Sequence, residues 1–391
     1  MKIKSILLAG LIALGFMACN NEEVPQVPNG PESTVSVKVM PSSNGPVLKA
    51  TGDLSGGLTA TGLAAESAIK QLEVFIFSGE SPDGYKSAAP EAGATTVTEV
   101  KGITTHSGPK TIVVVANANI GAVTSKAALL AKTKDVPATI ANGLVMTSEA
   151  TSVTLVAGQN YYGYAAGQIP SGTEHSVGSA LKITRVNARV AIVEAKLDAT
   201  LPAEQLAIFD ALTDAEVAIF NVPKTTKLFG APLATNAAYL FGEAWPSTAG
   251  SYTVGTAEGS FKNAVTFPIV NTAAPYYYVN ENTATNAKEQ MLIVLRAKPT
   301  KGGTAVVADG LYTDAAGYTY YPVWVNAPLA DYSYDTGHTA DCKILRNTQY
   351  NISLLIKGIG NPSIDDVEEA FLDVLVSVED WAVVTQGVTW N

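Results

Sequence analysis

The sequence predicts an all-β protein made of two tandem antiparallel β-sandwich domains. Apolar residues alternate with polar ones at the period of two that is typical of strands, as at Val35, Val37 and Val39. Hydrophobic residues make up 47% of the chain and charged residues 15%, with 33 glycines and 20 prolines, and this mixture favours short strands joined by turns. A length of 391 residues favours two domains over one or three.

The first residues have the layout of a lipoprotein signal peptide. Lys2 and Lys4 precede an apolar run over residues 6–16, and a small residue, Ala18, stands before Cys19. We therefore expect residues 1–18 to be removed and Cys19 to carry lipid; the alternative is an ordinary secretory signal in which Cys19 is incidental. The run is too short to span a bilayer as a helix, so the mature chain is expected to be anchored to the membrane by its lipid.

Residues 19–49 are predicted to form a tether followed by a short strand. The tether is polar and rich in proline, and Val35, Val37 and Val39 then alternate until Pro41 ends the strand. Residues 42–62 are rich in Ser, Gly, Thr and Pro, with Lys49 as the only basic residue. This composition predicts an exposed loop that is open to proteases.

Residues 50–186 are predicted to form the first sandwich domain. Apolar runs at residues 69–77 and 110–116 are the strongest strand signals, and shorter strands are expected at 143–148, 153–156 and 158–164. One or two short helices fit the alanine- and lysine-rich region between residues 121 and 142. Residues 181–193 are expected to form one long strand that bridges the two halves, with the boundary near Asn187.

Residues 187–368 repeat this pattern and are predicted to form the second sandwich. Strands rich in β-branched and aromatic residues are expected at 217–222, 274–279, 291–297, 318–325 and 350–356, separated by turn residues. The acidic residues near its end, Asp365, Asp366, Glu368 and Glu369, are more simply a solvated loop than a cation site.

The last segment, residues 369–391, is predicted to end the chain on a strand. Leu372, Val374, Val376 and Val378 share one face at the strand period, and a second apolar run follows at residues 381–384. A chain that ends on a strand presents unpaired backbone groups, which pair readily with another chain. We expect this segment to complete the sheet of a neighbouring molecule.

No catalytic, metal-binding or nucleic-acid-binding pattern stands out. The net charge is −10 and no Lys/Arg cluster is present, so nucleic acids are excluded as expected partners. His106, His175 and His338 lie far apart among small polar residues, and a zinc site would require the fold to bring them together. We therefore predict that the chain is not an enzyme and has no cofactor.

Two sets of side chains have a binding alternative. Tyrosines 276–278, and a second aromatic set, could stack on sugar rings, but alternate residues of a strand face opposite sides, so half of each set is expected in the core. Arg185 and Arg189 lie four residues apart in the predicted bridging strand, and ion-paired structural arginines are favoured over ligand recognition. The second aromatic set is Tyr318, Tyr320, Tyr321, Trp324, Tyr332 and Tyr334.

Taken in order along the chain, several segments resemble the FimA-type major fimbrillins of type V pili. They are the signal peptide, the early strand with its cleavable loop, and residues 112–119, 143–149, 181–190, 320–326, 344–356 and 380–390. The resemblance covers the whole chain and implies two transthyretin-like sandwich domains. It also implies a stalk subunit of a cell-surface fimbria that supports adhesion, with a precursor held at the outer membrane as a lipoprotein.

The resemblance further implies polymerisation by strand exchange. A trypsin-like surface protease would remove the strand that carries Val35, Val37 and Val39, and the C-terminal segment of a neighbouring copy would replace it, giving a head-to-tail filament. Related subunits usually present an arginine in the cleavage loop, whereas this chain offers Lys49, so we predict cutting after Lys49. Minor tip and anchor subunits are further implied partners. The expected donor residues are Leu375, Val376, Val378, Trp381, Val383, Val384, Val388 and Trp390.

A surface glycan-binding lipoprotein is the alternative function. It would share the signal peptide, the acidic composition and the aromatic residues. Such a protein needs no C-terminal donor strand and would keep its N-terminus attached at Cys19. The two alternatives therefore differ in whether the protein forms multimers and whether it loses its first strand.

Overall fold

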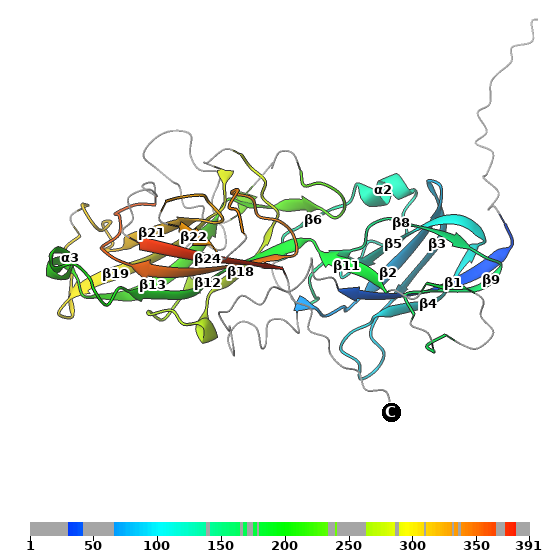
Figure 1. Ribbon diagram of the computed structural model, residues 1–391, viewed down its shortest axis with the longest axis horizontal. Coiled ribbons are helices and arrows are strands. Elements are labelled where there is room, and N and C mark those ends of the chain that lie inside the picture. Colours follow the sequence, from blue (N-terminus) through cyan, green and yellow to red (C-terminus); the bar gives the residue numbers. More distant parts are fainter. Residues whose placement is uncertain are drawn as a thin grey trace, which may run out of the picture.

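The computed structural model describes residues 30–41, 66–137, 141–164, 167–169, 175–177, 180–233, 239–240, 263–285, 289–308, 310–330, 332–334, 338–364 and 372–380. The molecule consists of two β-rich halves placed end to end (Figure 1). The prediction of two tandem β-sandwich domains is confirmed. No helix in the described part of the chain is long and apolar enough to cross a membrane.

The first half is built around one ten-stranded arrangement whose main path runs β10-β9-β1-β11-β7-β5-β2-β3, with β4 paired to β1 and β8 to β5. A short helix, α2 (Lys126–Leu130), lies in the predicted region and is capped by the Ser125 side chain. The strands are β1 (Glu32–Pro41), β2 (Leu72–Ser78), β3 (Ser81–Ala88), β4 (Glu99–His106), β5 (Gly108–Ala116), β6 (Thr133–Asp135), β7 (Met146–Thr147), β8 (Thr151–Leu155), β9 (Gly158–Tyr162), β10 (His175–Val177) and β11 (Leu181–Arg185).

The second half packs two five-stranded sheets against each other. One has the order β18-β12-β23-β24-β22, and the other has the path β17-β13-β19-β20 with β21 paired to β19. The helical elements are α3 (Ala203–Ile208) and η1 (Asn271–Ala273). The strands are β12 (Asn187–Leu197), β13 (Ala211–Phe220), β14 (Val222–Pro223), β15 (Thr225–Lys227), β16 (Tyr239–Leu240), β17 (Asn263–Ala264), β18 (Tyr276–Asn280), β19 (Leu292–Lys301), β20 (Thr304–Ala305), β21 (Thr319–Trp324), β22 (Tyr332–Tyr334), β23 (Thr348–Ile356) and β24 (Leu372–Asp380).

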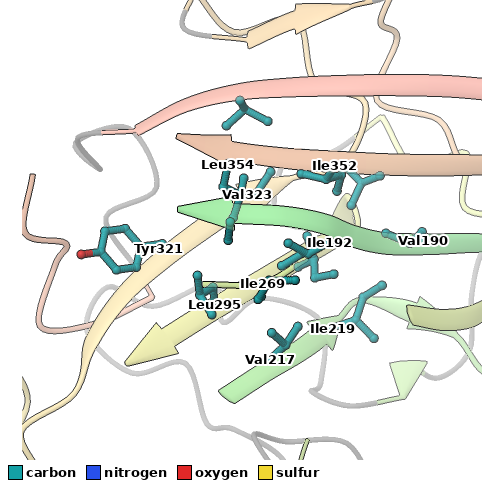
Figure 2. Close-up of a cluster of buried hydrophobic side chains, with 14 of the residues drawn as sticks. Val190, Ile192, Val217, Ile219, Ile269, Leu295, Tyr321, Val323, Ile352 and Leu354 are labelled. Atoms are coloured by element: carbon teal, nitrogen blue, oxygen red, sulfur yellow. The ribbon is translucent and has the colours of Figure 1, made fainter. Parts of the chain in front are cut away.

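Each half has its own apolar core, as the strand patterns predict. Figure 2 shows the core of the second half, where Val190, Ile192 and Ile352 from one sheet face side chains such as Val217 and Leu295 from the other. The core of the first half gathers the three valines of β1 with residues of β2, β4, β5, β8 and β11. Burial of these alternating side chains stabilises both sandwiches.

Two features differ from the sequence prediction. The sheets are mixed, because β1 pairs in parallel with β9 and β11, and β12 pairs in parallel with β23. The predicted bridging strand is two strands, β11 and β12, which are separated at Val186. The backbone N–H of Val186 donates to the carbonyl of Val145, and this contact ends the pairing in the first half before β12 enters the second.

Candidate functional site

The first strand, β1, is the best candidate for a functional element because it fills the interior of the first half. Val35 and Val37 have no exposed surface and Val39 is 3% exposed. Burying each valine contributes roughly 1.5–3 kcal/mol relative to leaving it in water, so the three together contribute on the order of 6 kcal/mol. Taking β1 away would therefore leave an apolar groove with three valine-sized positions at a spacing of two residues.

The backbone of β1 is paired on both sides. Residues 33–37 of β1 pair in parallel with β9 on one side and antiparallel with β4 on the other. Residues 39–41 pair in parallel with β11. A bulge against β4 falls between Val35 and Val37. β1 thus joins β4, β9 and β10 to the rest of the sheet. Its removal would leave unpaired N–H and C=O groups on β4, β9 and β11, and an added strand could satisfy them.

Hydrogen bonds from side chains also join β1 to the strands around it. The buried Asn160 donates from Nδ2 to the carbonyl oxygen of Thr34 at 3.2 Å, and the same side chain is fixed by hydrogen bonds to both backbone groups of Val156. Ser36 Oγ accepts a hydrogen bond from the N–H of Gly102 at the β4 bulge. Asn160 can serve any strand placed here, because it contacts a main-chain carbonyl.

Gly163 lies close against the backbone of β1. Its φ is +83°, and a Cβ at this position would stand 2.3 Å from the carbonyl oxygen of Lys38. We expect Gly163→Ala to lower the free energy of unfolding by about 2 kcal/mol or more, because it adds a backbone clash to an unfavourable φ. Guanidinium unfolding of the purified chain measures this.

Gly158→Ala is the matched control for this prediction. Gly158 also has a positive φ, of +93°, but an added Cβ there would meet no atom within 4 Å. The free energy of unfolding should fall less in this control, because the added methyl group only makes the positive φ unfavourable and meets no atom. Equal losses in the two variants would show that close contact with β1 does not set the requirement for glycine at 163.

A buried charged cluster lies beside the start of β1. Asp83 Oδ2 is 2.8 Å from Lys110 Nζ, and its Oδ1 is 2.8 Å from His106 Nδ1, where His106 is the residue paired with Glu32 of β1. Thr105 also donates to the carboxylate. Burial acts to raise the pKa of Asp83, but the hydrogen bonds from Lys110, Thr105 and His106 outweigh it and lower the pKa to about 2.

This pKa predicts how stability depends on pH. Because the folded-state pKa of Asp83 lies below its unfolded value, near 4, the carboxylate stabilises the fold above about pH 4, and this contribution is lost as the pH falls through 2. We expect Asp83→Asn to cost on the order of 2 kcal/mol at pH 7, with the difference from the unchanged chain shrinking toward pH 2. Guanidinium unfolding at pH 7, 4 and 2.5 measures this.

The exposed Glu80–Lys126 pair supplies the control for the pH series. Glu80→Gln should leave the stability almost unchanged at each pH, because exposed ion pairs contribute little. A loss in Asp83→Asn that stays constant from pH 7 to pH 2.5 would contradict the proposed role of the ionised carboxylate.

The structure places the first part of the predicted donor segment in β24. This strand is antiparallel to β23 over its full length, and Tyr332–Tyr334 of β22 pairs with its other edge. Val376 is completely buried in the core of the second half, Leu375 is 45% exposed, and Val378 lies in the same strand. The other predicted donor residues, Trp381, Val383, Val384, Val388 and Trp390, lie outside the described residues, as do Cys19, Lys49 and the acidic residues at 365–369.

The aromatic sets divide as expected between core and surface. Tyr277 is buried and donates to the carbonyl of Val217, and Tyr321 is completely buried. Tyr276 is 40% exposed, whereas Tyr278 donates to a buried carboxylate. In the second set, Tyr320, Tyr321 and Tyr334 donate from their hydroxyls to Asp314, to the carbonyl of Gly358 and to the carbonyl of Ala327.

The histidines serve local contacts in the structure. His106 contacts Asp83, and His338 Nε2 is 2.6 Å from Asn326 Oδ1. The strand that contains His175 pairs with β9. Within the described ranges, no group of three metal-binding side chains comes together.

Several residues of the groove were not predicted from the sequence. Asn160, Gly163 and the whole of β4 belong to its walls, although residues 158–164 were predicted as a strand. β4 carries a glycine, Gly102, and too few apolar residues to show a period of two. Gly102 and Gly163 both adopt a positive φ, which favours glycine. The sequence shows the two glycines but not this backbone angle, so the walls of the groove could not be recognised from it.

Comparisons with known proteins relate both halves of the chain to fimbrial subunits. Residues 33–187 match the family described as the major fimbrial subunit protein FimA, and residues 189–381 match the FimA4 pilin C-terminal domain. The chain is 32% identical to a major fimbrium subunit FimA type-2 of Porphyromonas gingivalis, and 32% identical to a FimA type-5 subunit of the same organism. Both alignments cover 100% of both chains.

Solved structures give the same result. The chain is similar to the crystal structure of a fimbrilin from P. gingivalis W83, with a TM-score of 0.70 and 26% identity over 90% of this chain and 99% of that one. A putative cell adhesion protein from Parabacteroides distasonis shares the fold, with a TM-score of 0.63 and 21% identity over 90% of this chain and 98% of that one.

Proposed function

The chain belongs to the FimA family of major fimbrial subunits, and on this premise we propose that it builds the stalk of a cell-surface fimbria by exchanging its first strand for a segment of a neighbouring copy. It is a structural subunit of a fimbria, and its family is not known for enzymes. The observation that carries the proposal is the position of β1, which is buried and paired on both sides although it lies near the N-terminus.

The first proposed step is maturation of the precursor. Residues 1–18 direct export, Cys19 receives lipid at the outer membrane, and a trypsin-like surface protease cuts after Lys49, the only basic residue of residues 42–62. The cut separates β1 from the rest of the chain, and release of β1 opens the groove. Residues 50–186 and 187–368 then form the two domains of the mature subunit, and residues 369–391 contain β24 and the exchanged segment.

The second proposed step is strand exchange. Because Val376 is locked in the core of its own half, releasing β24 would cost the subunit its own stability, and we place the donor segment after Asp380. Trp381, Val383, Val384, Val388 and Trp390 provide apolar side chains for the positions vacated by Val35, Val37 and Val39. A head-to-tail contact of this kind does not close on itself, so a filament grows.

The remaining partners follow from assembly at the cell surface. Tip and anchor subunits would bind at the two ends of the filament, where either a groove or a donor segment is left free. Adhesion to other surfaces is the proposed role of the finished fimbria. The lipid on Cys19 stays at the outer membrane with the removed N-terminal piece, so the subunits of the filament carry no lipid.

An unboiled gel of surface-sheared material tests the proposal. Strand-exchanged subunits are expected to run as a ladder, because every contact buries apolar side chains and adds a backbone ladder, and boiling should collapse it to one band. N-terminal sequencing of that band should begin at Ala50. A single unboiled band that keeps the intact N-terminus would contradict strand exchange and support the glycan-binding alternative.

A further inference from the structure

A buried ionic cluster joins the two halves at Glu66, the first described residue after the proposed cleavage loop. Glu66 and Arg189 have no exposed surface, and Arg189 Nη1 lies 2.8 Å from Glu66 Oε1. Tyr278 donates to the same carboxylate oxygen at 2.8 Å, and Arg189 Nη2 donates to Gln349 Oε1 at 2.6 Å. The Glu66 carboxylate of the first half is thus held by side chains of β12 and β18 in the second.

Arg185 extends the cluster along the same segment. Its guanidinium donates to the backbone carbonyl of Glu66, to Ser67 Oγ and to Asn347 Oδ1, at 2.7–3.1 Å. Burial lowers the pKa of Arg185 to about 10, so it remains charged at neutral pH. The sequence prediction that Arg185 and Arg189 are structural arginines is confirmed.

A second set of contacts joins the halves independently of this cluster. Strand β15 of the second half pairs with β6 of the first, and the apolar side chains of Leu228 and Phe229 pack in one cluster with Phe75 and Phe77. Arg346 and Glu281 form an ion pair beside it, and Arg346 also donates to the carbonyl of Leu228. The junction is therefore fixed at two separate places.

The location of Glu66 relates the ionic cluster to the loss of β1. β1 ends at Pro41, Lys49 lies in the segment that follows, and Glu66 is the first described residue after that segment. Cleavage after Lys49 would make Glu66 and Ser67 the contacts nearest to the new N-terminus within the described chain. Withdrawing a buried carboxylate from a buried arginine is unfavourable, because the arginine would keep its desolvation cost without its partner.

We propose that Glu66, Arg185 and Arg189 form a lock that fixes the retained end of the cleaved loop to the second half. Together with the second set of contacts, this lock keeps the two halves in their relative positions when release of β1 opens the groove, and of the two it is the lock that holds the segment that begins at Glu66. The inference rests on the proposed strand exchange, since the lock acts when β1 leaves. Glu66 is a positioning residue here.

Distances between spin labels on the two halves test the lock. Labels are placed on Ser87→Cys and Ala207→Cys, which are exposed positions on β3 and α3, in a chain with Cys19→Ser and Cys342→Ser. The otherwise unchanged chain is expected to give one narrow distance distribution before tryptic cleavage, and the same distribution after cleavage and removal of the piece that carries β1, which mass spectrometry verifies. Glu66→Ala should broaden the distribution after cleavage, and hydrogen exchange over residues 66–72 should become at least about tenfold faster.

Two further variants complete the test. Glu66→Gln keeps the size and one acceptor of the side chain, so it should fold and broaden the distribution less than Glu66→Ala. Glu80→Ala removes an exposed ion pair of the first half and should leave the distances unchanged. An unchanged narrow distribution in both Glu66 variants after cleavage would overturn the lock.

The chain without a substitution at Glu66 provides a further check, which does not depend on whether the variants fold. Its residues 66–72 should stay protected from hydrogen exchange after cleavage, and loss of that protection would also overturn the lock. All these measurements use the unpolymerised chain, so their results would remain valid even if the chain formed no filaments. If the lock were disproved, the gel ladder would still be expected, and the proposed function would be unaffected.

Discussion

Deleting residues 381–391 is expected to abolish filament extension while leaving a folded, secreted subunit. The deletion removes Trp381, Val383, Val384, Val388 and Trp390 but keeps β24, whose Val374 and Val376 complete the core of the second half. Without the donor segment, the groove of the next subunit cannot regain its buried apolar contacts. The ladder of the unboiled gel should collapse to monomer, and electron microscopy should show no filaments.

The longer deletion of residues 375–391 gives an informative contrast. The structure shows that this deletion would remove Val376 and most of β24 from a packed sheet. We expect it to lower the free energy of unfolding by several kcal/mol. Filaments of normal length from the 381–391 deletion would refute the donor assignment.

Lys49→Gln is expected to have the second large effect, by keeping β1 in place. A trypsin-like protease needs a basic side chain at the cleavage site, and glutamine has similar length without the charge. The precursor should then retain its N-terminus and its occupied groove, and the gel ladder should be lost. N-terminal sequencing and the unboiled gel, run on the same cells, measure both outcomes.

Lys49→Arg is the matched control for this substitution. Arginine keeps the positive charge, so cleavage and the ladder should both persist. If Lys49→Gln still forms a ladder and its subunits begin elsewhere within residues 42–62, the position of the cut is wrong but strand release stands. A ladder from subunits that keep their intact N-terminus would refute release of β1.

The sequence predicts much of the fold because most strands carry their own signal. β1, β2, β5, β19 and β23 have continuous or alternating apolar residues, and each was expected within a few residues of its observed limits. β3 and β4 were missed because their residues are mostly polar or exposed, with Pro82 and Gly84 in one and Gly102 in the other. Such strands are held by their neighbours more than by their own pattern.

The groove is harder to predict because its walls come from distant parts of the chain. The alternating valines of β1 indicate a strand that is buried on one face, but they do not indicate which strands flank it. The contact between Asn160 and Thr34, and the one between Gly163 and Lys38, exist only because β9 lies parallel to β1. The Glu66 lock was equally hidden, although its two arginines were expected to be structural.

The distant pairing of β1 also has a consequence for folding kinetics. Val39 near the start of the chain pairs with Leu181, and Ser33 pairs with Gly158. Long-range contacts of this kind slow folding, because a large loop must close before the contacts stabilise it. The first half therefore cannot finish folding until residues near 185 have been synthesised. β1, although it is made first, can take its place only after β4, β9 and β11 have been made.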